Sequence, residues 1–168
     1  MKYIFLLRHG HAPRSGNEPD KERQLSPVGR KEIGEVAAFL KEKKYPEIII
    51  ASDAVRTRQT TEHFCQAAGY QPLCQFTSDL YNCSTDDIIR VIENCENGYD
   101  RLMIVGHNPG ITSVVDLFPS VRSDRALEVK SRNYEPTAKL VLLKANLSSW
   151  RDMSKAKWEM DAVFWPEL

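Results

Sequence analysis

Residues 3–10 read YIFLLRHG, an apolar run that ends abruptly in Arg8, His9 and Gly10. Five consecutive apolar residues without a helical period are typical of a buried β-strand. Glycine permits the tight turn that a chain makes where it leaves the core. The stretch therefore predicts a strand over residues 3–7 that delivers an arginine and a histidine to the edge of a sheet.

Outward from this stretch, short apolar runs alternate with segments that have helical character. Further strands are predicted in PEIIIAS, QPLCQF, RLMIVG and KLVLLKA, at residues 46–52, 71–76, 101–106 and 139–145. Strands that alternate with helices indicate an α/β fold with a mostly parallel central sheet. A length of 168 residues favours one domain over residues 1–168.

The helices between these strands are predicted from their end signals. Ser26 and Pro27 open one helix, and Ser84 with Asp87 three residues later opens another as a capping box. The helix between them is expected to be capped by Ser52 or Asp53 and to stop at Gly69. The tail over residues 150–168 is expected to be irregular, with its three tryptophans packed on the body.

Three polar segments follow three of the predicted strands. Arg8-His9-Gly10 follows the first, residues 52–58 follow the second, and His107-Asn108 follows the strand at 101–106. Ligands bind at the carboxyl edge of such sheets, where loops after parallel strands meet. The topology therefore places Arg8, His9, Arg56 and His107 at one edge, and we expect His11, His63 and Arg58 to lie outside the reacting centre.

This combination of residues predicts phosphoryl chemistry. Clustered positive groups repel one another unless an anion lies between them, and arginine matches phosphate geometry. A neutral imidazole is a nucleophile toward phosphorus. We expect His9 to attack, while Arg8, Arg56 and His107 stabilise the transferring group and water then hydrolyses the phosphohistidine. Because His9 must be neutral, kcat/KM is expected to fall at acid pH as a ring of ordinary pKa, about 6.5, protonates.

The composition excludes several other classes. Lys plus Arg and Asp plus Glu each number 23, so no basic excess indicates nucleic acid or an anionic membrane. The acidic and histidine residues have no convincing metal-ligand spacing, and we expect neither a metal nor another cofactor. The four cysteines lack a zinc-site pattern and no apolar run is long enough to span a bilayer, so a cytoplasmic protein with reduced thiols is expected.

Three motifs resemble the histidine phosphatase (phosphoglycerate-mutase-like) superfamily: LLRHG at 6–10, SDAVRTRQT at 52–60 and VGHNPG at 105–110. The chain is most similar to the short SixA-type phosphohistidine phosphatases, which the segments LYNCSTDDIIRVI and EPTAKLVLL also resemble. The resemblance implies a three-layer α/β/α fold and His9 as the phosphorylated residue. It also implies a phosphate pocket of Arg8, Arg56 and His107, to which Gly10 and Asn108 are added as expected phosphate-binding residues.

The chain departs from the superfamily's mutases and many of its phosphomonoesterases at the proton donor. Asn82 occupies the region where their acidic residue is sought, and Ser15 replaces an asparagine of the mutases. A phosphate ester needs a proton on its leaving oxygen, whereas imidazole departs readily because its conjugate acid has a pKa of about 6.5. The missing acid therefore favours phosphohistidine as substrate, although Asp20, Asp79, Asp86 and Asp87 stay open as donors.

The favoured interpretation is a metal-independent phosphatase that acts on phosphohistidine in a protein such as a phosphotransfer domain. A short chain with few insertions is expected to leave an open pocket, which a protein-borne phosphate requires. Two alternatives stay open. One is a phosphatase for a small phosphorylated metabolite, which would need an acid. The other is a non-catalytic phosphate-binding module, which the presence of His9 and Arg56 disfavours. The sequence specifies neither the partner nor the oligomeric state.

Overall fold

The central sheet has six strands among the described residues, which in this computed structural model are 1–118 and 135–167. Its spatial order is β3-β2-β4-β1-β5-β6. The strands are β1 (Lys2–Arg8), β2 (Ile48–Ser52), β3 (Leu73–Thr77), β4 (Arg101–Gly106), β5 (Leu140–Ala145) and β6 (Glu159–Phe164). The first four in chain order are mutually parallel where they pair, while β5 and β6 are antiparallel additions. The predicted α/β fold with a mostly parallel sheet is confirmed.

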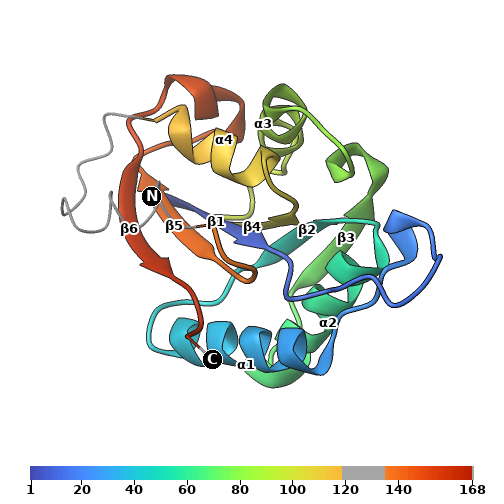
Figure 1. The fold of residues 1–168 in the computed structure, drawn as a ribbon. Coiled ribbons are helices and arrows are strands. Elements are labelled where there is room, and N and C mark those ends of the chain that lie inside the picture. The colour runs from blue at the N-terminus through green and yellow to red at the C-terminus, as the bar shows by residue number, and fades with distance from the viewer. Residues whose placement is uncertain (119–134, 168) are drawn as a thin grey trace.

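Helices cover both faces of the sheet and give the three layers that the resemblance implied. Helices α1 (Pro27–Lys41) and α2 (Val55–Ala68) lie on one face, and α3 (Thr85–Glu93) and α4 (Gly110–Asp116) lie on the other (Figure 1). Short 3-10 turns η1 (Asp20–Glu22), η2 (Ser78–Leu80) and η3 (Trp150–Lys155) complete the elements. Among the described helices, none has the length and apolar character that a bilayer crossing requires.

The core forms two apolar clusters because side chains of a strand alternate between the faces of the sheet. In β1, Phe5 and Leu7 pack in the cluster under α1 and α2, whereas Ile4 and Leu6 pack in the opposite cluster. Parallel strands that are covered on both faces read as continuous apolar runs, which explains the sequence of residues 3–7. The buried strand is a rigid base for the residues that follow it.

Most predicted helix ends are confirmed, and one is wrong. Ser26 caps α1, Ser84 and Asp87 form the capping box of α3, and α2 stops at Gly69 in a left-handed conformation. Neither Ser52 nor Asp53 caps α2, because its N-cap is Ala54. The buried Ser52 hydroxyl instead accepts a hydrogen bond from the backbone N–H of Ala54, at the edge where the polar segments meet.

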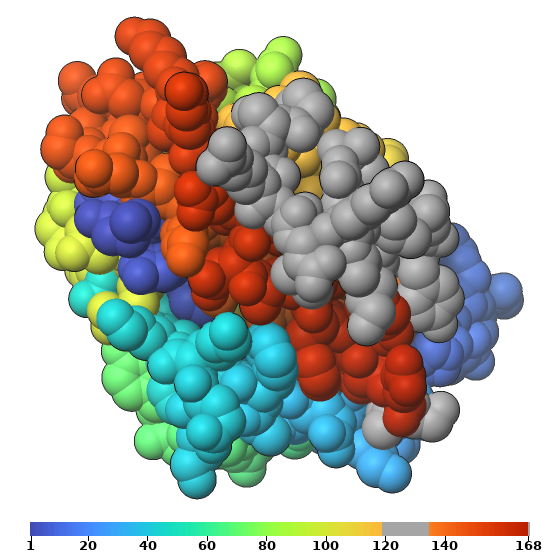
Figure 2. All heavy atoms as spheres, turned by 90° about the vertical axis from the view of Figure 1, so that its left-hand side faces the viewer, coloured from blue at the N-terminus to red at the C-terminus, as the bar shows by residue number. Residues whose placement is uncertain are grey.

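The prediction of an irregular tail is also wrong. Residues Glu159–Phe164 form the edge strand β6 against β5, with Met160 and Ala162 buried on alternate positions. Figure 2 faces this side of the molecule, where the C-terminal residues lie across the surface in red. Trp150 and Trp158 pack in the core as expected, and Trp165 is half-buried.

Candidate active site

The carboxyl ends of β1, β4 and β2 bring three distant segments together. These strands are parallel neighbours in the sheet, so the residues that follow them share one edge. Arg56, in the first turn of α2, lies between two imidazoles: its Nε is 3.4 Å from His9 Nε2, and its Nη2 is 3.2 Å from His107 Nδ1. The two rings are 5.3 Å apart between centroids. The structure therefore brings together the three segments that the sequence placed at one edge.

Arg8 contributes a second guanidinium from the last position of β1. Its Nη1 donates a hydrogen bond to the backbone carbonyl of Glu135 at 2.8 Å. Its Nε is buried and has no hydrogen-bond partner among the described residues. A buried donor without an acceptor is costly, and a guanidinium stays protonated at neutral pH. Arg8 therefore offers a donor that an oxyanion can satisfy.

The His9 ring is buried and is held by a hydrogen bond to its own loop. Its Nδ1 lies 2.7 Å from the carbonyl oxygen of Gly10, which only accepts, so we assign the proton to Nδ1 and leave Nε2 with its lone pair. Burial lowers the pKa of His9 to about 3, with smaller contributions from His107 and the arginines, against the raising effect of the Gly10 carbonyl. The ring is thus neutral at pH 7. The fall of kcat/KM at acid pH stays a prediction, and burial places the protonation of His9 at lower pH than in an exposed imidazole.

His107 is fixed from both sides. Its Nε2 lies 2.8 Å from Ser52 Oγ, and its Nδ1 faces Arg56, which can only donate. Burial lowers the pKa of His107 to about 4, with Arg56 adding to the effect and Asp20 opposing it. A phosphoryl anion beside the ring would favour its protonation, and His107 could then donate to the anion.

Tyr81, which the sequence did not single out, and Asp20, which it left open as a proton donor, complete the pocket. Tyr81 presents its ring edge-on to His107 at 5.6 Å, and its hydroxyl donates to Asp20 Oδ2 at 2.7 Å. The same oxygen accepts from Arg56 Nη2 at 3.1 Å, while Asp20 Oδ1 accepts from Arg23 Nη1 at 2.9 Å. The position of Tyr81 just beyond β3 at the same sheet edge was the available signal for this residue. For Asp20 the signals were its acidity and the resemblance of its loop to the SixA-type proteins.

Comparisons with known proteins agree with this geometry. The family model for the histidine phosphatase superfamily (branch 1) matches residues 4–85, which contain the Arg-His-Gly and Arg56 motifs. The match covers just under half of the chain and shows that this part is similar to the histidine phosphatase superfamily. The sheet and helices place the superfamily's motifs at one edge, as described above.

Solved structures extend the likeness over nearly the whole chain. A candidate phosphohistidine phosphatase SixA of Agrobacterium tumefaciens matches with a TM-score of 0.81 and 23% identity over 98% of both chains. Another, of Nakamurella multipartitia, has a TM-score of 0.83 and 22% identity over 99% of this chain and 97% of its own. The protein histidine phosphatase SixA with tungstate has a TM-score of 0.76 and 17% identity over 97% and 96%. At these identities the likeness establishes the fold.

Gly10 and Asn108 both have hydrogen-bond partners within the protein. The Gly10 N–H donates to Thr60 Oγ1 at 3.1 Å, and a Cβ at this position would lie 2.8 Å from the Gly29 carbonyl. The Asn108 side chain donates to Glu135 Oε2 at 2.9 Å. Their direct contact with phosphate stays a prediction. The contacts described support neighbouring residues instead: the Gly10 carbonyl faces His9 Nδ1, and Asn108 binds Glu135, whose backbone carbonyl accepts from Arg8.

The remaining candidates separate clearly. Asp79 and Asp86 are exposed, and Asp87 is engaged in the capping box of α3, so Asp20 is the member of this acidic set that hydrogen-bonds within the site. His11 is exposed, with Nδ1 2.8 Å from Ser26 Oγ. The other secondary candidates are Arg58, which is exposed and lies over the Phe76 ring, and His63, which is half-buried on α2. Within residues 1–118 and 135–167, no three His, Cys, Asp or Glu side chains form a group that could hold a metal ion.

Proposed function

We propose that this chain is a metal-independent phosphatase in which His9 carries the phosphoryl group. The observation that supports the proposal most directly is the neutral His9 ring, with its unprotonated Nε2 facing Arg56 in a buried pocket. Arg8 adds a second guanidinium with a free donor, and His107 closes the opposite side. A nucleophile surrounded by donors to oxyanions is suited to phosphoryl transfer.

The proposed reaction has two displacements. The Nε2 lone pair of His9 forms a bond to phosphorus while the bond from phosphorus to the leaving atom breaks, and the leaving group keeps that electron pair. Water then attacks phosphorus, the bond to Nε2 breaks and inorganic phosphate leaves, with the water proton passing to solvent. Arg8 and Arg56 stabilise the charge on the transferring oxygens in both steps. The Gly10 carbonyl keeps Nδ1 protonated, so the same nitrogen is presented in each cycle.

We propose phosphohistidine on a protein, such as a phosphotransfer domain, as the substrate. The departing imidazole has a conjugate acid of pKa about 6.5, so it needs little help from an acid. The site supports this choice because Asn82 is exposed where a donor was sought, and Asp20 is held as a carboxylate by Tyr81 and two arginines. The likeness in fold to proteins described as phosphohistidine phosphatases is consistent with the same substrate class.

The test is a side-by-side measurement of kcat/KM on a histidine-phosphorylated phosphotransfer domain and on a panel of phosphomonoesters. Wild-type protein should hydrolyse the phosphoprotein far faster than any ester, and His9→Ala should lose both activities. His63→Ala is the matched control, because His63 lies on α2 outside the contacts of the pocket. If one small ester is the preferred substrate, the proposed substrate class is wrong while the phosphatase chemistry stands.

A further inference from the structure

The guanidinium of Arg56 uses two different sides, and only one faces the reacting centre. Nε and Nη2 form the side that faces the imidazoles, with contacts to His9 Nε2 and His107 Nδ1 at 3.4 and 3.2 Å. Nη1 and Nη2 form the end of the group, and both bind Asp20. Nη1 donates to the backbone carbonyl of Asp20 at 2.7 Å, and Nη2 donates to its carboxylate at 3.1 Å.

This division has a geometric consequence for phosphate binding. Two hydrogen bonds from the end of a planar guanidinium to one residue, here to the backbone oxygen and Oδ2 of Asp20, restrict both rotation and translation of the group. Its side is then fixed toward the position between His9 and His107, where the transferring group must lie to be attacked by Nε2. Arg56 is 5% exposed, so little solvent competes for these donors.

Asp20 is itself held in place by groups outside the reacting centre. Arg23 Nη1 binds Oδ1 at 2.9 Å, and the Tyr81 hydroxyl binds Oδ2 at 2.7 Å. Arg23 also donates through Nε to the carbonyl of Ala12, which ties it to the loop after β1. The carboxylate therefore has fixed partners on both oxygens, and its orientation is set before any ligand arrives.

We propose that Asp20 is a positioning residue that orients Arg56 for the transferring phosphoryl group, rather than the proton donor of the reaction. The proposal rests on the phosphatase function and assigns a positioning role to a residue that the sequence left open only as a proton donor. Its partners also lower the pKa of the Asp20 carboxyl well below its usual range, first through the Tyr81 hydroxyl and then through Arg23. A carboxyl that stays ionised at neutral pH has no proton to give to a leaving group.

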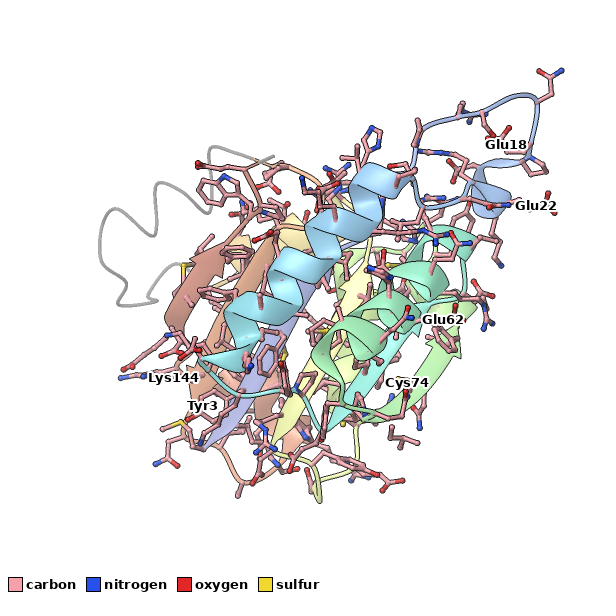
Figure 3. The ribbon with its side chains drawn as sticks, turned by 90° about the horizontal axis from the view of Figure 1, so that it is seen from below. Tyr3, Glu18, Glu22, Glu62, Cys74 and Lys144 are labelled. Carbon is pink, nitrogen blue, oxygen red and sulfur yellow. The ribbon has the colours of Figure 1, made fainter. Side chains whose placement is uncertain are left out.

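The first test measures oxyanion affinity without turnover. Tungstate is titrated calorimetrically into wild-type protein, Asp20→Ala and Asp20→Asn. A misplaced guanidinium should weaken tungstate binding by about 10- to 100-fold in Asp20→Ala. Both variants keep the backbone carbonyl that accepts from Arg56 Nη1, and Asp20→Asn also keeps one side-chain oxygen, so it should weaken binding less than Asp20→Ala. Glu22→Ala is the matched control, because Glu22 is exposed on the same 3-10 turn as Asp20 (Figure 3). This variant should bind tungstate as wild type does.

The second test separates positioning from proton donation. The same variants are assayed on aryl phosphates whose phenol leaving groups become progressively more basic. Positioning predicts the same fractional loss of kcat/KM on every ester and on the phosphoprotein. Proton donation predicts a loss that grows with the basicity of the leaving group and spares the phosphoprotein.

The outcomes are distinguishable from failure of the function itself. Equal tungstate affinity in wild type and Asp20→Ala, or a loss that depends on the leaving group, would overturn the positioning role and leave the phosphatase intact. If wild type binds tungstate but hydrolyses no phosphorylated substrate, the proposed function fails, and the affinity of Asp20→Ala still decides the role of Asp20. Thermal unfolding of each variant, and the milder Asp20→Asn, guard against a loss caused by misfolding.

Discussion

The two ends of β1 each carry a cation, Lys2 buried and Arg8 half-buried, and the two side chains differ in how their donors are satisfied. At the amino end, the Lys2 Nζ donates to the carbonyls of Asn97 and Tyr99 and to the Asp100 carboxylate, at 2.9 to 3.0 Å. At the carboxyl end, Arg8 donates to one carbonyl while its buried Nε has no hydrogen-bond partner among the described residues. Figure 3 shows how far apart these ends are, with Tyr3 of β1 opposite Glu18 and Glu22.

This contrast distinguishes a structural cation from one that is ready for a ligand. Three acceptors match the three donors of an ammonium group, so Lys2 needs nothing further. Arg8 instead has a buried Nε–H without an acceptor among the described residues. An unpaired buried donor costs free energy, so a ligand that accepts a hydrogen bond from it would be stabilised. The same strand therefore anchors the fold at one end and presents chemistry at the other.

The largest expected effect is on activity at the carboxyl end. Arg8→Ala removes one of two guanidinium groups that stabilise the transferring oxygens, so kcat/KM on the phosphoprotein should fall by about 10²- to 10³-fold. The free energy of unfolding should change little, because the lost side chain leaves one carbonyl, that of Glu135, without this donor. Steady-state kinetics and urea unfolding measure the two quantities. If Arg8→Ala lost stability and kept its activity, Arg8 would be a structural cation like Lys2, and the contrast between the two ends of β1 would be wrong.

The next effect concerns the pH dependence of stability. Burial lowers the folded-state pKa values of His9 and His107 to about 3 and about 4. Between pH 6.5 and pH 4 these two histidines are therefore protonated in the unfolded chain and neutral in the folded chain. This contribution to stability is complete about one pH unit above the unfolded-state pKa of about 6.5, and stability should decrease by about 4 kcal/mol between pH 7 and pH 5. Urea unfolding at the two pH values measures this change. His9→Gln should halve it, and equal stability at both pH values would contradict the burial of neutral rings.

At the amino end, stability should change without activity. Lys2→Met keeps an apolar side chain near the Trp150 ring but removes the donor to the carbonyls of Asn97 and Tyr99. Loss of those hydrogen bonds should cost about 2 kcal/mol, while kcat/KM should stay as in wild type. The exposed Lys43→Met is the control, with an expected change within about 0.5 kcal/mol. A fall in kcat/KM of Lys2→Met would mean that the two ends of the strand are coupled.

The smallest effect tests why the site lacks an acid. Asn82 is exposed, next to Tyr81, with a φ of 49°, and aspartate tolerates this left-handed conformation about as well as asparagine. Asn82→Asp should raise kcat/KM on phosphomonoesters by about 10-fold, a fraction of what a well-placed general acid supplies, and should leave phosphohistidine hydrolysis unchanged. If both activities stay unchanged, the leaving-group argument for the substrate class loses its support.

The sequence predicted what depends on local pattern. The apolar run at residues 3–7, the Ser26-Pro27 helix start and the Ser84–Asp87 capping box each require only neighbours along the chain, and each is confirmed. The meeting of Arg8, His9, Arg56 and His107 was expected because each follows a strand that was predicted to be parallel, and the pairing of β1, β2 and β4 agrees with this. Their roles in catalysis remain predictions that the experiments above test.

What depends on distant contacts could not be predicted in the same way. Residues 159–164 form a strand because they pair with β5, and their mixture of charged and apolar side chains gave no buried run. Asp20 reaches Arg56 across 36 residues, so no local pattern indicates its position. The depressed pKa of His9 arises from burial, which only the packed structure reveals.

The central claim, that His9 carries the phosphoryl group, is tested most directly by trapping the intermediate. Wild-type protein is mixed with a phosphotransfer domain that bears ³²P-phosphohistidine, quenched with alkali within one turnover, and mapped by peptide mass spectrometry. The account predicts label on Nε2 of His9 in wild type and no label in His9→Ala. Release of phosphate with no labelled enzyme, or label on another residue, would contradict it.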